Sequence, residues 1–526
     1  MRPRLAITFA ISLLASGCFT NADGQKPSAE EMFFPTGLAM SFAGRVLYIA
    51  NSDFDLRYSG GSVLALDLKQ LRGDVAPVAA ELGAGNSSEV ACAAAGRESN
   101  ANPWLNPGPC SAFPLAPYVR ASALTGAFAS GLLHLKDEAT NRARLFAPVR
   151  GDPSVTFFEV EDDSQLGPND EPSFLLACDT DDAGFCGDEH RIGRDPERNL
   201  RGVQLPADPI GIAATVDGRA VVTAHQTEQA ASLITHDFQT TPQLDYFASN
   251  LAAGPTDVTT IPPPAMLEPA RSAAADAGLG FHYDPGFALT YRETAEISFL
   301  RFFSDSGAIP PRPFIFRTDT FPITTNLGGY DSRGMAIVDQ NRRSCESICD
   351  GALDCLVACA ENNPLDVFIA NRTPPSLIIG QIHSVVHRTW VGGLSEPVVH
   401  GGAETLTLFD TLPLDFGPSR VITGDIVTPA GALEPRVFVV CFDSRLVFAV
   451  NPTTRTIESV IRTGRGPHAV LVDTGTDDDG TPYSLLYVGH FTDSYIGVVD
   501  LHQGHPSTYG QMIASIGLPT PPKGSK

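Results

Sequence analysis

The stretch from Gly464 to Leu501 contains three short apolar segments separated by turns. They read HAVLVD, then SLLYVGH after an acidic turn, then YIGVVDL after a tight turn, and a further apolar run follows at Gln511–Ile516. Short apolar segments bounded by turn residues predict antiparallel strands. A unit of about fifty residues with three or four such strands cannot bury both faces of its sheet alone, so we expect the unit to recur.

The three-segment pattern does recur along the chain. A proline precedes or opens the first segment in six of the seven copies. The predicted first strands begin at Pro35, Pro117, Pro209, Pro255, Ser332, Pro418 and Pro467. In the third segment, one column is apolar in every copy. Its members are Val63, Val155, Leu233, Ile297, Leu377, Val447 and Ile496. Seven copies with matching columns predict seven sheets.

The segments LYIANS…GSVLALDL, VFIAN…SLIIGQI and LYVGHFTDSYIGVVDL resemble the YVTN-type repeat of bacterial β-propellers. The resemblance covers residues 33–518 and implies an all-β, seven-bladed β-propeller. The 48 glycines and 42 prolines agree with a turn-rich β chain. Because propellers carry out unrelated activities, the resemblance says almost nothing about function.

The copies are unequally spaced, so some carry insertions. We expect inserts near 83–116, 161–207, 341–364 and 391–416. Loops on a rigid scaffold often carry binding residues, although variable decoration without a binding role is an equal alternative for any one of them.

Residues 1–17 have the features of a secretory signal. Arg2 and Arg4 precede a short apolar run, and Ala15-Ser16-Gly17 follows it. The next residue is Cys18, and this arrangement resembles the lipobox of bacterial lipoproteins. The resemblance implies that Cys18 becomes the mature N-terminus and carries several acyl chains, which anchor a protein stably. The alternative is a soluble secreted protein cleaved elsewhere.

The sorting rule of Gram-negative lipoproteins predicts the membrane in which the protein resides. A residue other than Asp after the lipidated cysteine, here Phe19, implies the outer membrane. We expect residues 18–32 to form a flexible tether and residues 519–526 a disordered tail.

Cysteines of an exported protein are expected to pair. Cys92 with Cys110, and Cys178 with Cys186, flank short polar loops and predict local bridges. The spacing C-x3-C-x5-C-x3-C predicts a helical hairpin with the nested bridges Cys345–Cys359 and Cys349–Cys355, because residues four apart share a helix face. A zinc site is the alternative for these four residues.

One cysteine remains after this pairing. Cys441 occupies the strand-end column that holds Asn51, His225, Asn371 and His490 in other copies. We therefore expect a buried, unreactive thiol.

The first strand of each propeller blade lines the central channel, so the residue after each first-strand start should lie at one channel mouth. The candidate binding residues at this mouth are Tyr118, Arg333, His468, Thr36 and Ser419. Such a ring could hold an anionic or sugar-like ligand. The alternative is that these side chains bond to neighbouring backbone and channel water.

Acidic turns at 473–480 and 179–189 offer oxygen ligands of the kind calcium prefers. Asp477 and Asp479 are the weak calcium candidates, and solvated turns are the alternative. We otherwise expect no cofactor and no metal. The sequence lacks the GxSxG, HExxH, P-loop and GxGxxG motifs, so it offers no catalytic residues.

A formal net charge of −24 argues against nucleic acid as a partner. The sequence therefore predicts a monomeric, lipid-anchored propeller of the outer membrane, facing the periplasm or the cell surface. We expect it to bind a protein or glycan partner of the cell envelope through its inserts and one channel face. The alternative is a propeller enzyme of the lactonase or quinoprotein type with its site at the channel mouth.

Overall fold

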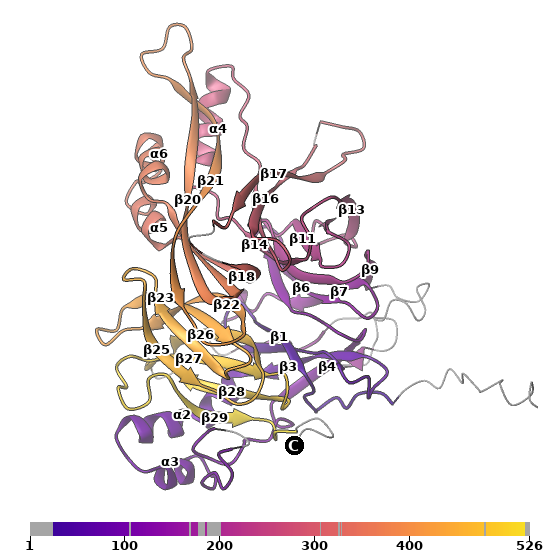
Figure 1. The fold of residues 1–526 in the computed structure, drawn as a ribbon, viewed down its shortest axis with the longest axis vertical. Coiled ribbons are helices and arrows are strands. Elements are labelled where there is room, and N and C mark those ends of the chain that lie inside the picture. The colour runs from indigo at the N-terminus through magenta and orange to yellow at the C-terminus, as the bar shows by residue number, and fades with distance from the viewer. Residues whose placement is uncertain are drawn as a thin grey trace, which may run out of the picture.

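The computed structural model describes residues 25–104, 107–167, 170–176, 185–186, 201–305, 307–324, 327, 329–477 and 480–520. These residues form seven sheets arranged as the blades of a β-propeller (Figure 1). The predicted all-β, seven-bladed fold is therefore confirmed. Residues 1–24, which include Cys18, lie outside this description.

Each blade is an antiparallel sheet of four main strands that follow one another along the chain. The first blade contains β1 (Pro35–Met40), β2 (Val46–Asn51), β3 (Gly61–Asp67) and β4 (Val119–Thr125), with the short β8 (Phe185–Cys186) parallel to β4. The second contains β5 (Leu133–Asp137), β6 (Arg142–Val149), β7 (Ser154–Glu161) and β9 (Gly202–Gln204), with a 3-10 turn at Asp163–Gln165. The third contains β10 (Pro209–Ala214), β11 (Ala220–His225), β12 (Ala230–Thr235) and β13 (Gln243–Ala248).

The remaining blades follow the same order. The fourth contains β14 (Pro255–Thr260), β15 (Gly286–Tyr291), β16 (Glu296–Phe303) and β17 (Phe314–Pro322). The fifth contains β18 (Tyr330–Val338), β19 (Leu365–Thr373), β20 (Pro375–Thr389) and β21 (Val398–Pro413). The sixth contains β22 (Pro418–Val427), β23 (Leu433–Cys441), β24 (Leu446–Asn451) and β25 (Thr456–Arg462), and the seventh β26 (Pro467–Thr476), β27 (Pro482–His490), β28 (Tyr495–Asp500) and β29 (Gln511–Ile516).

The second strands are apolar throughout because neighbouring blades cover both of their faces. All six residues of β2 and all six of β11 are buried. The core is therefore divided into clusters that lie between adjacent blades. One such cluster joins Phe368 of the fifth blade to Val437 and Val439 of the sixth. Three outer strands, β13, β17 and β25, by contrast present most of their residues to solvent.

One predicted strand was assigned to the wrong blade. The segment after Pro117 does not open the second blade, because it forms β4, the fourth strand of the first blade. The second blade opens at β5 instead. Five of the seven residues of β4 are buried, so this outer strand has the apolar character of an inner one. The insert between β3 and β4 contains α2 (Leu68–Gly83) and α3 (Ser88–Ala94), so it begins before the predicted 83–116.

The ring closes by packing of complete blades. β1 of the first blade lies beside β26 of the seventh, and β29 completes the last blade from its own chain segment. The insert of the first blade then pairs with the outer edge of the seventh. The Phe113 N–H donates to the Ser515 carbonyl at 2.8 Å, and the Gly517 N–H donates to the Phe113 carbonyl at 2.8 Å. These bonds tie the two ends of the propeller together.

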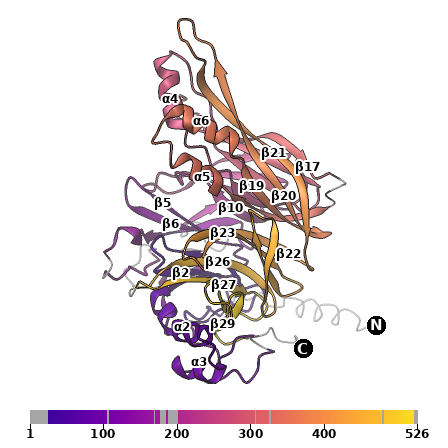
Figure 2. The same ribbon diagram turned by 90° about the vertical axis from the view of Figure 1, so that its left-hand side faces the viewer.

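A projection extends from the fourth and fifth blades, and we call it the tower. It consists of α4 (Leu267–Asp276), α5 (Gln340–Glu346), α6 (Leu353–Asn362) and the distal parts of β20 and β21, which run past the rest of the blade (Figures 1 and 2). The predicted insert 341–364 supplies α5 and α6. The predicted insert 391–416 is mostly strand β21 rather than a loop.

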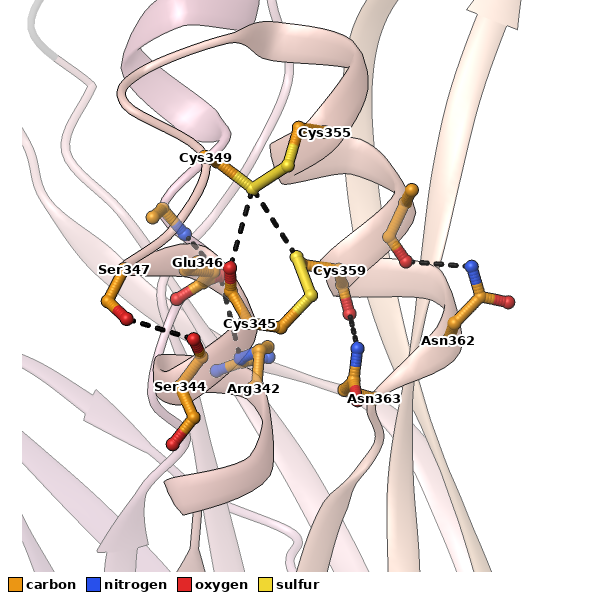
Figure 3. The surroundings of a disulfide bond; sticks show 12 residues. Arg342, Ser344, Cys345, Glu346, Ser347, Cys349, Cys355, Cys359, Asn362 and Asn363 are labelled. Atoms are coloured by element: carbon orange, nitrogen blue, oxygen red, sulfur yellow. Dashed lines mark hydrogen bonds and ion pairs between the residues drawn. A yellow bond between two sulfur atoms is a disulfide. The ribbon is translucent and has the colours of Figure 1, made fainter.

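The described cysteines pair as predicted. Cys92–Cys110, Cys345–Cys359 and Cys349–Cys355 are disulfides. Cys345–Cys359 joins α5 to α6, and Cys349–Cys355 joins the turn after α5 to α6 (Figure 3). Cys441 is a buried free thiol at the end of β23, and burial raises its pKa to about 12. The predicted Cys178–Cys186 bridge lies outside the described residues. Among the described helices, none is long and apolar enough to cross a membrane.

Candidate binding site in the central channel

The inner strands share a backbone irregularity where they begin. Six of the seven, all except β5, shift register within their first residues. A β-bulge leaves an extra residue without a partner and turns its side chain out of the regular alternation. The residues left out of register include Thr36, Ser419 and His468, which are three of the predicted mouth residues.

Two of those residues are satisfied within the fold. The Thr36 Oγ1 donates to the Ala129 carbonyl of the next blade at 2.7 Å. The Ser419 Oγ donates to the Val440 carbonyl at 3.3 Å. Thr36 and Ser419 therefore bond to neighbouring backbone, which is the alternative to ligand binding given by the sequence.

The other predicted mouth residues behave differently from one another. Arg333 lies at the bulge of β18, where its Nη2 donates to the Asp331 carboxylate at 3.0 Å. His468 is partly exposed and lies against the rings of Phe442 and Phe491.

The prediction for Tyr118 is wrong. Tyr118 lies just before the outer strand β4, is 2% exposed, and donates its hydroxyl to Asp74 of α2 at 2.8 Å. It is therefore a core residue that fixes the insert of the first blade.

The most informative position lies two residues after the residue that pairs with the end of each second strand. The seven residues there are Gly37, Gly131, Gly211, Asp257, Gly334, Arg420 and Ala469. Five are glycine or alanine, and the two exceptions carry opposite charges. Small residues at five positions leave room around the axis for two long side chains.

Contacts at the glycines locate both charged groups. A Cβ atom added to Gly211 would lie 2.7 Å from the Asp257 Oδ1, and one added to Gly334 would lie 2.8 Å from its Oδ2. The Asp257 carboxylate therefore fills space between the third and fifth blades. A Cβ atom on Gly131 would lie 3.9 Å from the Arg420 Nη2. Arg420 thus extends from the sixth blade toward the second, across the channel.

Burial and mutual attraction set the charge of this group. Burial raises the pKa of Asp257 to about 6, and the positive charge of Arg420 partly offsets that rise. Burial lowers the pKa of Arg420, against the opposing effect of Asp257. The pKa of His468 falls to about 3 because of burial and the nearby Arg420, so the imidazole is neutral at physiological pH. Asp257 and Arg420 are too far apart for an ion pair of 4.0 Å or less.

A continuous set of aromatic rings borders the same end of the channel, and we call it the aromatic rim. Its members are Phe34, Phe54, Phe128, Phe442 and Phe491. Phe54, Phe442 and Phe491 follow second strands, whose ends lie where the first strands begin. Phe54 is 57% exposed, and Phe491 lies 6.0 Å from the His468 ring, centroid to centroid. The rim therefore offers apolar surface next to the charged groups.

The sequence holds a signal for Asp257 and Arg420. The predicted mouth residues directly follow the strand starts, whereas the two charges stand one position later. Aligning the predicted starts at that position shows an Asp and an Arg among three glycines, an alanine and Val119. What the sequence could not show is that the two charges face one channel.

Two sets of residues bear on the predicted metal sites, the calcium candidates of the acidic turn and the cysteines of the tower. Asp477 lies in a tight turn, in which the Gly480 N–H donates to the Asp477 carbonyl at 2.9 Å, and Asp479 lies outside the described residues. Cys349, Cys355 and Cys359 bring three sulfur atoms within 4.8 Å of one another. Disulfide bonds hold all three, and a thiolate is the form that binds a metal ion, so these residues do not fit a metal as they stand.

Fold and site together define a seven-bladed propeller with an oppositely charged pair in its channel. No family model matches the chain, and no curated protein matches it in sequence. Several solved structures are similar over most of their length. A putative 6-phosphogluconolactonase from Bacteroides uniformis is 11% identical, with 82% of this chain and 86% of that chain covered and a TM-score of 0.41.

Two further structures are similar at the same level. Hydrazine synthase from Kuenenia stuttgartiensis is 11% identical, with coverage of 92% and 99% and a TM-score of 0.45. The periplasmic gluconolactonase of Pseudomonas aeruginosa is 9% identical, with coverage of 82% and 86% and a TM-score of 0.42. Similarity this distant does not bear on the activity of this chain.

Proposed function

We propose that this protein is a binding propeller whose ligand site lies in the central channel, between Asp257 and Arg420. The observation that carries the proposal is that two opposite charges face the central channel without forming an ion pair with each other. A charge that is removed from water and has no opposite charge in contact costs free energy, because protein replaces part of its hydration. Such a cost is typical of functional sites, where a ligand supplies the partner.

Three surrounding features support a site for a small ligand. The glycines opposite both charged groups leave room for the Asp257 and Arg420 side chains at this level. The bulges at the strand starts are held by bonds to neighbouring blades, such as the one from Thr256 to the Ser332 carbonyl at 2.7 Å. The aromatic rim provides apolar contact at the entrance. Pre-formed concave sites with a few placed polar groups are typical of small-molecule binding.

Thermal-shift measurements on the purified protein test the proposal. The probes are inorganic phosphate, D-gluconate and glycine, which share an anionic group and differ in everything else. We expect at least one to raise the Tm of the wild type, and Arg420→Gln to abolish that rise. Arg462→Gln, an exposed arginine on the outer strand of the same blade, is the matched control. No shift with any probe, or an equal shift in Arg420→Gln, would contradict the proposal.

One observation favours hydrolysis as a second candidate function. A carboxyl with a pKa of about 6 is suited to act as a general base near neutral pH, and Arg420 could stabilise a developing oxyanion across the channel. This is the lactonase type of activity that the sequence left open. The test is release of acid from D-glucono-δ-lactone above the uncatalysed rate, lost in Asp257→Asn. A rate unchanged by that substitution removes this candidate.

The cellular setting is also a proposal. We propose that a lipid on Cys18 holds the propeller at the outer membrane and that the tower or the inserts contact a protein or glycan of the cell envelope. Cross-linking in cells, followed by purification and mass spectrometry against the Cys18→Ser form, tests this. A partner recovered only with the anchored form supports it. Equal recovery with both forms counts against a role for the anchor.

A further inference from the structure

We infer that the channel site takes a zwitterionic α-amino acid with an apolar side chain. The inference rests on the proposed function, and it names the ligand class. In it, the ligand carboxylate binds Arg420, the ligand ammonium binds Asp257, and the side chain lies toward the aromatic rim.

The charges of the site favour a ligand that carries both signs. Asp257 and Arg420 contribute one negative and one positive group to the same space. A simple anion would pair with Arg420 but would lie near the Asp257 carboxylate, which repels it. A simple cation would pair with Asp257 but would lie near the Arg420 guanidinium, which repels it. Only a ligand with an acid and an amine a short distance apart provides a partner for both groups.

The other titratable side chains at this level do not change that balance. His468 is neutral, because burial and Arg420 both disfavour its charged form. Arg333, at the neighbouring bulge of β18, is neutralised by Asp331. The site therefore presents one opposed pair of charges, as an amino acid does.

The geometry also agrees with an α-amino acid. The carboxylate of Asp257 is fixed between two inner strands by the backbones of Gly211 and Gly334, and the Arg420 guanidinium reaches from the opposite side. Their separation exceeds the 4.0 Å of an ion pair yet is short enough for each to shift the pKa of the other. Two opposite charges that do not pair directly can each bind one charged group of the same small ligand. The planar guanidinium matches a carboxylate in two parallel hydrogen bonds.

The aromatic rim offers a surface for the apolar part of the ligand. His468 connects the charged groups to the aromatic rim. Arg420 lowers the pKa of His468, and the His468 ring lies against Phe442 and Phe491. An apolar or aromatic side chain leaving the charged centre in that direction would meet ring surface. Aromatic side chains pair favourably with one another at these centroid separations.

Four probes with the same phenyl group separate the possible ligand classes. They are L-phenylalanine, 3-phenyllactate, 3-phenylpropionate and phenethylamine, which differ only in the polar groups they carry. Binding is measured by isothermal titration calorimetry near neutral pH on the wild type, Asp257→Asn and Arg420→Gln. Asp319→Asn and Arg462→Gln, exposed residues on outer strands of the same two blades, are the matched controls.

We expect L-phenylalanine to bind at least about tenfold more tightly than the other three probes. Asp257→Asn should remove its advantage over 3-phenylpropionate, and Arg420→Gln should abolish binding of every acid. Arg420→Lys, which keeps the charge but not the planar fork, should retain weakened binding. A cooperative thermal transition of Arg420→Gln without ligand shows that its loss of binding is not a failure to fold.

Two results would overturn the inference. If 3-phenylpropionate or 3-phenyllactate binds as tightly as L-phenylalanine and only Arg420→Gln weakens it, the ligand is a simple acid. The proposed function then stands and the zwitterion is wrong. If none of the four probes binds, the inference is also wrong, while the proposed function is decided separately by the phosphate, gluconate and glycine measurements.

Discussion

The Sγ atom of Cys349 lies 3.5 Å from the Sγ atom of Cys359, so the two nested disulfides of the tower touch each other (Figure 3). Both buried sulfurs belong to an apolar cluster that also contains Met266, Leu356 and Val399. All members of that cluster come from the tower and the chain segments next to it. The clusters between blades contain none of them, so the disulfides stabilise the tower and not the blades.

Removing the inner bridge should therefore loosen the tower alone. In Cys349→Ser/Cys355→Ser we expect faster amide hydrogen exchange in α5 and α6, corresponding to about 2 kcal/mol less local stability, because the short loop is no longer closed. Exchange in the second strands should not change. The matched control is Cys92→Ser/Cys110→Ser, which should affect α3 instead. Faster exchange in the blades of the first variant would show that the tower and the propeller unfold together.

Asp257 should make stability fall as pH rises. Its pKa is 3.8 in the unfolded chain and about 6 in the folded protein, so between these values the folded state binds more protons. This contribution is fully present below about pH 4 and is lost as pH rises through 6. Asp257→Asn lacks it. We expect the Tm of Asp257→Asn relative to wild type to be higher near pH 7.5 than near pH 4, whereas Asp319→Asn shows no such trend. Equal differences at both pH values would contradict the burial of this carboxyl.

A buried ion pair joins the tower to the fourth blade. Arg301 of β16 pairs with Glu404 of β21, and the Tyr283 hydroxyl donates to the Glu404 Oε1 at 2.7 Å. Glu404→Leu should cost about 3–5 kcal/mol, because it leaves the Arg301 charge buried without a partner. Chemical denaturation measures this. The double variant Arg301→Met/Glu404→Leu should recover part of the loss, and a loss equal to the sum of both single variants would mean that the pair is not coupled.

The lipid anchor is tested without any structural assumption. We expect the wild-type protein to sediment with membranes and to incorporate radiolabelled palmitate, and Cys18→Ser to do neither, because a chain without acyl groups has nothing to hold it in the bilayer. Cys441→Ser serves as the control for loss of a cysteine elsewhere. Membrane retention of Cys18→Ser at the wild-type level would overturn the lipoprotein prediction.

The repeat made most of the blades predictable. The second strands are covered by blades on both sides, so they must be apolar at every position, and this makes them visible in a single sequence. Outer strands lack that constraint. The apolar outer strand β4 therefore looked like an inner one, and Tyr118 was placed at the channel mouth although it binds Asp74 of α2.

The candidate site, too, is only partly predictable from the sequence. The sequence predicts Arg333 and His468 at the channel mouth, and both lie at bulges of inner strands. It does not predict Asp257 and Arg420 as site residues, because a lone Asp and a lone Arg in two of seven repeats form no local motif. They become a site only when the ring brings the fourth, sixth and second blades around one channel.

The seven blades, the buried thiol of Cys441 and the three disulfides of the described chain are predictable from the sequence, because each depends on local periodicity and short spacing. How the ring closes and which charges face each other depend on contacts that only the folded chain makes. Closure depends on the contact between β1 and β26 and on the pairing of Phe113 with β29, across most of the chain length. No local pattern encodes a contact between residues that far apart, and the charged pair across the channel exists only because that closure holds.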